Sequence, residues 1–184
     1  YAQFFWLYGM VSCYTCPNLY NHNLYFLLNF SLRKDSSMFN HILVATDLSL
    51  RAEMATQKAV QLAHQFNSKI TMLNVHDEFM NDDEMQMLRV SVEKMKNEFS
   101  KTASSAKVEM KKIIHDLHAE DIQVDFLIRE GKANKKILDE AKRLNVSLIV
   151  MGTNGRSNLH DYILGTTSEY VVSNAECPIL VVPI

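Results

Sequence analysis

Three of the chain's five glycines fall in one short window that could form a phosphate-binding loop. Two residues separate Gly152 from Gly155, and Gly165 and Thr166 follow after a spacer of nine residues. Glycine lets the backbone approach a ligand closely, successive free N–H groups can surround an anion, and a helix N-terminus adds its dipole. The hydroxyls of Thr166 and Thr167 could bond phosphate oxygens or a metal-bound water. The alternative is a loop that needs glycine only for turning and helix packing, but the long spacer ending in a hydroxyl favours the phosphate cradle.

Asp47 and Ser49 form a second candidate group, directly after the first apolar run of the regular part of the chain. Asp-x-Ser before a helix is a common start signal, so we expect Ser49 to cap the helix. We expect Asp47 to contact a ligand in addition. His76 and His160 are interpreted as solvated loop residues near the predicted site.

No residue is assigned a catalytic or metal-binding role. The sequence contains no P-loop, no nucleophile elbow and no carboxylate–histidine pair fixed by spacing. His115 and His118 share a helix face without a visible third ligand, and the pair Cys13-x-x-Cys16 has no second pair. Slow hydrolysis of a bound nucleotide stays an alternative.

From Met38 onward, short apolar runs alternate with segments of helical period, and these elements must position the candidate residues. The runs predict strands at 41–45, 69–75, 123–128, 147–152 and 178–184. The helical segments predict helices at 50–66, about 83–118, about 134–144 and 167–173.

This alternation predicts an α/β fold of the Rossmann-like or flavodoxin-like type. The sheet is an open, parallel one of five strands with helices on both faces, and the expected strand order is 3-2-1-4-5. The partly alternating third strand suits an edge position. Such sheets bind ligands beyond the carboxyl ends of their strands, where the strand order reverses. We therefore expect the site after the first, second and fourth strands, at 45–49, at 75–78 and from 152 onward.

The composition is that of an ordinary globular protein, with 47% hydrophobic residues and a net charge of −2. No basic field indicates nucleic acid or an anionic membrane as a partner, so a phosphate would have to be held by local backbone groups and helix dipoles. Cys177 is the one cysteine after Met38, which fits a reducing compartment, the cytoplasm.

Residues 1–37 have a different composition, rich in Tyr, Phe, Asn and Leu and nearly free of charge. The segment lacks the features of a signal peptide, and its apolar runs are too short for a membrane span. We interpret it as upstream sequence attached by a misplaced start, with Met38 as the true first residue. The alternative is a real, loosely structured extension, and we expect no function from it in either case. The predicted domain is 38–184.

The glycine window resembles the Gly-x2-Gly-x9-Gly-Ser/Thr pattern of the nucleotide-binding branch of the universal stress protein family. Segments 41–49, 129–157 and 174–184 are similar to the opening strand with its Asp-x-Ser turn, the third helix with the fourth strand, and the closing Cys-Pro strand of that family. The resemblance covers nearly all of 38–184, whereas the segment at about 83–118 matches only in length and character. One departure is Leu48, which stands where the family often has glycine and could narrow the pocket or change the loop.

The resemblance implies an adenine-nucleotide site, with ATP as the ligand and Mg²⁺ as a possible companion. Asp47 would lie near the ribose and phosphates, and the backbone of Val75 would meet the adenine. The phosphate loop and its flanking residues would be Gly152, Gly155, Arg156, Gly165, Thr166 and Thr167. The resemblance also implies a homodimer formed through the final strand, 179–182, and a stress-response or regulatory role. The alternatives are a slow ATP hydrolase or switch and a nucleotide-free dimeric interaction module.

Overall fold

The computed structural model describes residues 6–7, 10–11, 38–77, 91–153 and 164–183. The chain divides into two compact units, Tyr1–Asp35 and Ser36–Ile184. In the first unit, β1 (Trp6–Leu7) and β2 (Met10–Val11) form a short antiparallel pair. All other described helices and strands belong to the second unit.

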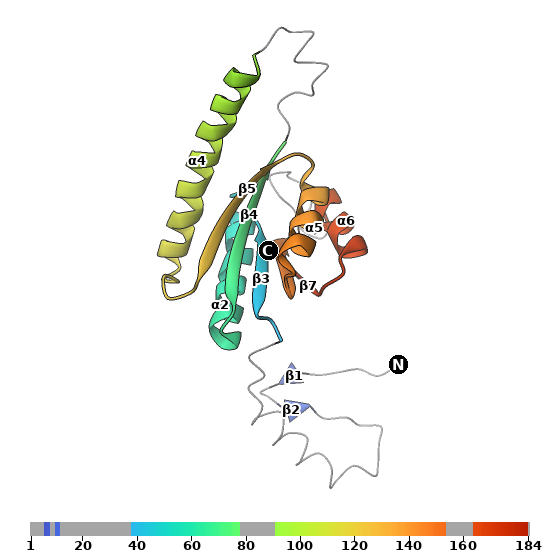
Figure 1. The fold of residues 1–184 in the computed structure, drawn as a ribbon. Coiled ribbons are helices and arrows are strands. Elements are labelled where there is room, and N and C mark those ends of the chain that lie inside the picture. Colours follow the sequence, from blue (N-terminus) through green and yellow to red (C-terminus); the bar gives the residue numbers. More distant parts are fainter. Residues whose placement is uncertain (1–5, 8–9, 12–37, 78–90, 154–163, 184) are drawn as a thin grey trace. The chain divides into compact units, whose positions relative to one another are not determined.

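Strands and helices alternate along the second unit, as the apolar pattern predicts (Figure 1). The strands are β3 (His41–Ala45), β4 (Lys69–His76), β5 (Val124–Glu130), β6 (Leu148–Gly152) and β7 (Ile179–Val182). The helices are α2 (Leu50–Phe66), α4 (Val92–Asp116), α5 (Ala133–Leu144) and α6 (Thr166–Asn174).

The sheet has the order β5-β4-β3-β6-β7, and every neighbouring pair of strands is parallel. This order is the predicted 3-2-1-4-5, with the third strand at an edge, so the fold prediction is confirmed. The order reverses between β3 and β6, whose chains leave toward opposite faces of the sheet. The carboxyl ends of these two strands are therefore the place where this fold leaves room for a ligand.

Helices cover both faces of the sheet because the central strands are apolar on both sides. Successive side chains of a strand point to opposite faces. Ile42 and Val44 of β3 pack in one buried cluster with residues of α2 and α4, whereas Leu43 and Ala45 pack in another with residues of α5 and α6. Figure 1 shows the two helix layers on opposite sides of the sheet.

Helix α4 is apolar along one stripe, but the sheet buries only the carboxyl-terminal half of that stripe. Ala106, Met110 and Ile113 are buried, whereas Met95 and Phe99 are half-exposed. The sequence predicts a start near 83, and the structure places the helix start at Val92, after the Ser91 cap. Residues 83–90 lie outside the described part.

None of the described helices combines the length and the apolar character needed to cross a membrane.

Candidate functional site

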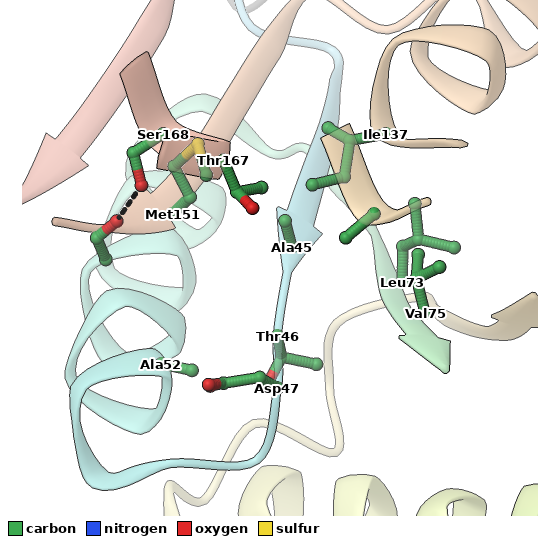
Figure 2. A pocket seen from close by; sticks show the side chains of 12 residues that line it. Ala45, Thr46, Asp47, Ala52, Leu73, Val75, Ile137, Met151, Thr167 and Ser168 are labelled. Atoms are coloured by element: carbon green, nitrogen blue, oxygen red, sulfur yellow. Dashed lines mark hydrogen bonds between the residues drawn. The ribbon is translucent and has the colours of Figure 1, made fainter. Parts of the chain in front are cut away.

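A pocket opens at the carboxyl ends of β3, β4 and β6, where the strand order reverses (Figure 2). It encloses about 600 Å³, including its open mouth, which is within the range of small-molecule sites, roughly 300–1,000 Å³. Strand ends and three helices supply its wall. The described lining residues are Ala45, Thr46, Asp47, Ala52, Leu73, Val75, Ala133, Ile137, Met151, Gly152, Thr167 and Ser168.

Asp47 lines the pocket and also organises the start of α2. Its Oδ1 accepts hydrogen bonds from the backbone N–H of Ser49 at 3.1 Å and from the Ser49 hydroxyl at 2.6 Å. The Ser49 oxygen in turn accepts from the N–H of Ala52 at 3.3 Å, so Ser49 is the N-cap of α2 as predicted. Figure 2 shows the Asp47 side chain directed toward Ala52. The two roles weighed for Asp47, helix start and pocket wall, are therefore compatible.

The chain that leaves β6 returns to the same place at the start of α6. The N–H of Gly165 donates to the carbonyl of Thr153 at 2.8 Å, which joins the two ends of the glycine window. The Ser168 hydroxyl donates to the carbonyl of Gly152 at 3.0 Å and ties the first turn of α6 to the end of β6. These two bonds fix the position of the α6 N-terminus at the pocket.

The first turn of α6 presents hydrogen-bond donors. Its N-cap is Gly165, which has no side chain to bond the first N–H groups of the helix. Unpaired N–H groups and the helix dipole favour an anion at such an end. The side chain of Thr167 lines the pocket (Figure 2), whereas neighbouring Thr166 is exposed and is not among the described lining residues.

The opposite wall of the pocket comes from α5 and is apolar. Gly131 precedes this helix with φ +127°, a conformation that residues with a side chain rarely adopt. Its N–H donates to the carbonyl of His76 at 2.8 Å, so the turn brings the start of α5 to the end of β4. Ala133 and Ile137 of α5 then lie across from Leu73 and Val75 of β4.

The two described glycines of the window, Gly152 and Gly165, have ordinary backbone angles. Gly152 has no positive φ, and a Cβ built there would lie 3.5 Å from the carbonyl oxygen of Arg51, at ordinary contact distance. Gly165 has φ −67°, which any residue can adopt. A larger side chain at Gly152 would therefore meet the first turn of α2 and the pocket instead of straining the loop.

The structure brings part of the predicted site together. Asp47, Val75, Gly152 and Thr167 line the one pocket, and Gly165 and Thr166 stand at the α6 start beside it. Three candidate residues of the glycine window lie outside the described residues: Gly155, Arg156 and His160. The cysteine pair Cys13 and Cys16 also lies outside them. The interpretation of His76 as a solvated loop residue is wrong: it is the last residue of β4 and half-buried, and its buried Nε2 has no hydrogen-bond partner among the described residues.

The segment 45–49, where the sequence predicts part of the site, includes the lining residues Ala45 and Thr46, but sequence reasoning missed most of the apolar wall and assigned no role to Ser168. Leu73 and Met151 could have been found, since they lie just before predicted site segments. Ser168 follows Thr166 and Thr167 in one run of hydroxyl residues, and this run could have indicated Ser168 as a site residue. Ala133 and Ile137 carry no chemical signal and depend on how the Gly131 turn places α5.

Leu48 adopts the backbone conformation that glycine usually supplies. Its φ is +63°, in the left-handed region. Its N–H donates to the Thr46 hydroxyl oxygen at 3.1 Å, and its side chain packs against the cluster under α2 and α4. Leu48 is not among the described lining residues of the pocket. The departure from glycine therefore keeps the left-handed turn and directs the added side chain into the core.

Within the described ranges, no group of three His, Cys, Asp or Glu side chains could hold a metal ion. Cys177 packs half-buried against the core cluster of α5 and α6, and burial raises the pKa of its thiol.

Comparisons with known proteins agree on one family. The family model described as the universal stress protein family matches residues 38–183. Universal stress protein MJ0577 of Methanocaldococcus jannaschii is 30% identical, over 80% of this chain and 96% of the relative. The solved structure of UspA from Lactobacillus plantarum has a TM-score of 0.66 and 26% identity, covering 78% of this chain and 97% of that one. A universal stress protein solved in complex with cAMP has a TM-score of 0.56 and 17% identity, covering 78% and 96%.

Proposed function

The chain belongs to the universal stress protein family, and from this premise we propose that it binds an adenine nucleotide, ATP, in the pocket at the ends of β3, β4 and β6. The binding serves a stress-response or regulatory role rather than a dedicated catalytic one. We place the protein in the cytoplasm, because a chain with one cysteine after Met38 gains nothing from an oxidising compartment. Cell fractionation tests this location.

The observation that carries the proposal is the division of the pocket into an apolar and a polar side. Leu73, Val75 and Ile137 form an apolar wall suited to a flat purine base. The N-terminus of α6, with Thr167 and Gly152 beside it, supplies the donors and dipole that suit phosphate groups. A nucleotide is the small molecule that joins an aromatic ring to phosphates.

Two further points support the choice of ligand. A member of the same family was solved with cAMP, an adenine nucleotide. The pocket also contains oxygen ligands of the kind that Mg²⁺ prefers: the Asp47 carboxylate and the Thr167 hydroxyl. We therefore include Mg²⁺ as a companion of ATP, to be tested by titration with and without the ion.

The experiment is to purify the full chain, denature it, identify released nucleotide by chromatography, and titrate ATP into the emptied protein by calorimetry. Gly152→Ala and Gly152→Val form a matched pair. The Ala Cβ lies at ordinary contact with Arg51, so binding persists. The larger Val side chain enters the pocket, so we expect binding to fall at least tenfold. A parent chain that releases no nucleotide and does not bind added ATP would overturn the proposal.

We also propose that two copies of the chain associate through β7. This strand carries Ile179, Leu180 and Val181, all half-exposed, and among described residues it pairs only with β6. An apolar edge strand with one unpaired side invites pairing with a second copy.

The backbone of β7 shows which substitution tests this pairing. The carbonyls of Pro178 and Val182 accept hydrogen bonds from β6 and the residue after it, so the N–H of Val181 points away from β6 by strand alternation. Val181→Pro removes that N–H and should give a monomer by light scattering, whereas Val181→Thr should stay dimeric; a dimeric proline variant would exclude edge pairing.

A further inference from the structure

A carboxylate on α5 is buried between two arginines. Glu140 has a side chain only 9% exposed. Its Oε1 accepts from Nε of Arg129 at 2.6 Å, and its Oε2 accepts from Nε and Nη2 of Arg143 at 2.8 and 2.6 Å. Burial raises the pKa of Glu140, but hydrogen bonds from Arg143 and Arg129 outweigh it and hold the pKa below the usual value. The group is therefore a fixed negative charge.

The two arginines differ in which elements they connect. Arg143 lies three residues after Glu140 on the same helix, so its bond stays within α5. Arg129 belongs to β5, so its bond to Glu140 joins the helix to the sheet. The Arg129 guanidinium also donates from Nη1 to the carbonyl of Ile128 at 3.0 Å, which fixes its orientation along β5.

Both ends of the Arg129–Glu140 bond stand next to the pocket wall. Arg129 is the register partner of Val75 in the β4–β5 ladder. Glu140 lies one turn beyond Ile137 on the buried face of α5. Val75 and Ile137 both belong to the apolar wall and to the same packed cluster. A shift of α5 relative to the sheet would change the distance between them.

The Glu140 ion pairs stand on an otherwise apolar buried face of α5. The neighbouring buried positions of α5, Ile137 and Ala141, are apolar. Buried ion pairs are often no more stabilising than apolar replacements, but they fix geometry because their bonds are directional. The start of α5 lacks a side-chain cap at Lys132, and the backbone bond from Gly131 to His76 ties the preceding turn to β4.

We propose that Arg129 is a positioning residue, whose bond to Glu140 sets the place of α5 and so the width of the apolar wall of the nucleotide pocket. The effect on affinity rests on the nucleotide-binding function proposed above, whereas the effect on α5 does not. Arg129 itself is not among the described lining residues.

The test uses Arg129→Gln and Arg143→Gln in the full chain. Each variant removes one positive charge and leaves Glu140 one arginine, but only Arg129→Gln breaks the connection to β5. ATP affinity by calorimetry should fall about tenfold in Arg129→Gln and stay within about twofold in Arg143→Gln. Arg129→Lys should recover part of the loss, because it restores a charged donor.

A second readout does not depend on any ligand. Hydrogen exchange of the Ile137 and Leu138 amides should quicken in Arg129→Gln alone, with the amides of α2 unchanged. If the parent does not bind ATP but this difference is seen, the nucleotide proposal fails and the positioning role stands. Equal effects of the two glutamine variants on exchange, or unchanged exchange in Arg129→Gln, would overturn the positioning role.

Discussion

The two ends of the same sheet differ in how completely their polar side chains are hydrogen-bonded. At the amino ends of the strands, His41 Nε2 and Thr71 Oγ1 share a hydrogen bond of 2.8 Å, and Ser147 both donates to and accepts from the His41 backbone. At the carboxyl ends, Asp47 and Ser168 are hydrogen-bonded, but other polar atoms have no partner among the described residues. These include the Thr167 hydroxyl, which faces the pocket, and the buried Oδ1 of Asn74. The carboxyl ends thus keep polar atoms available for a ligand.

Backbone strain follows the same division. Three non-glycine residues with positive φ, Asn67, His118 and Asn145, end helices at the amino side of the sheet. Asn and His tolerate this conformation better than most residues. Leu48, the fourth, stands at the carboxyl side next to Asp47. Backbone strain at a residue that tolerates positive φ poorly is typical of functional sites.

The same substitution at the two ends should give the largest contrast. Thr71→Val keeps the side-chain shape but leaves the buried His41 ring nitrogen unpaired, so the free energy of unfolding should fall by about 1–3 kcal/mol. Thr167→Val removes a hydroxyl that faces the pocket, and the free energy of unfolding should change by less than about 0.5 kcal/mol. Urea unfolding of both variants measures the difference. Equal losses at the two sites would show that the ends do not differ.

A smaller contrast concerns pH. Burial, with help from the nearby Lys69 charge, lowers the pKa of His41. The unfolded chain then binds a proton first, near its ordinary pKa of about 6.5. The contribution of neutral His41 to the free energy of unfolding is complete above a pH of about 6.5, the pKa in the unfolded chain. It is lost as the pH falls from there toward the lower folded pKa, and the free energy of unfolding then changes by at most about 1.4 kcal/mol per pH unit.

Replacing His41 separates its contribution to the pH dependence of stability from the contributions of the other histidines. Between pH 7.5 and 5.5, the free energy of unfolding should decrease more steeply in the parent than in His41→Gln. Urea unfolding at each pH gives the two slopes. Parallel curves would mean that His41 does not take up a proton differently in the folded and unfolded chain.

The strands were predictable from sequence, whereas the hydrogen bonds at their amino ends and much of the site at their carboxyl ends were not. A strand buried on both faces reads as a continuous apolar run, so β3 was predicted at its observed bounds. The glycine window and Asp47 are local signals. Which of Thr166 and Thr167 lines the pocket depends on the rotation of α6, and the link from Arg129 to Glu140 depends on how α5 returns over β5. Neither follows from spacing alone.

The smallest effect tests whether Leu48 stores strain at the carboxyl ends of the strands. Leu48→Ala loses the packing of the leucine against the core but keeps a Cβ at φ +63°. Leu48→Gly loses the same packing and relieves the backbone, since a Cβ costs roughly 1–2 kcal/mol in this region. Greater freedom of glycine in the unfolded chain offsets part of that gain, by about 0.5–1 kcal/mol.

The glycine variant should therefore be more stable than the alanine variant by about 0.5–1 kcal/mol, the reverse of their usual order in a regular helix or strand. Asn145 serves as the matched control at the amino ends of the strands, because asparagine tolerates the left-handed region. Asn145→Gly should change the free energy of unfolding by less than the difference between Leu48→Gly and Leu48→Ala. Thermal unfolding of the variants compares the two positions. An alanine variant at Leu48 as stable as the glycine variant would mean that the turn after β3 is relaxed, and that strain does not distinguish the two ends of the sheet.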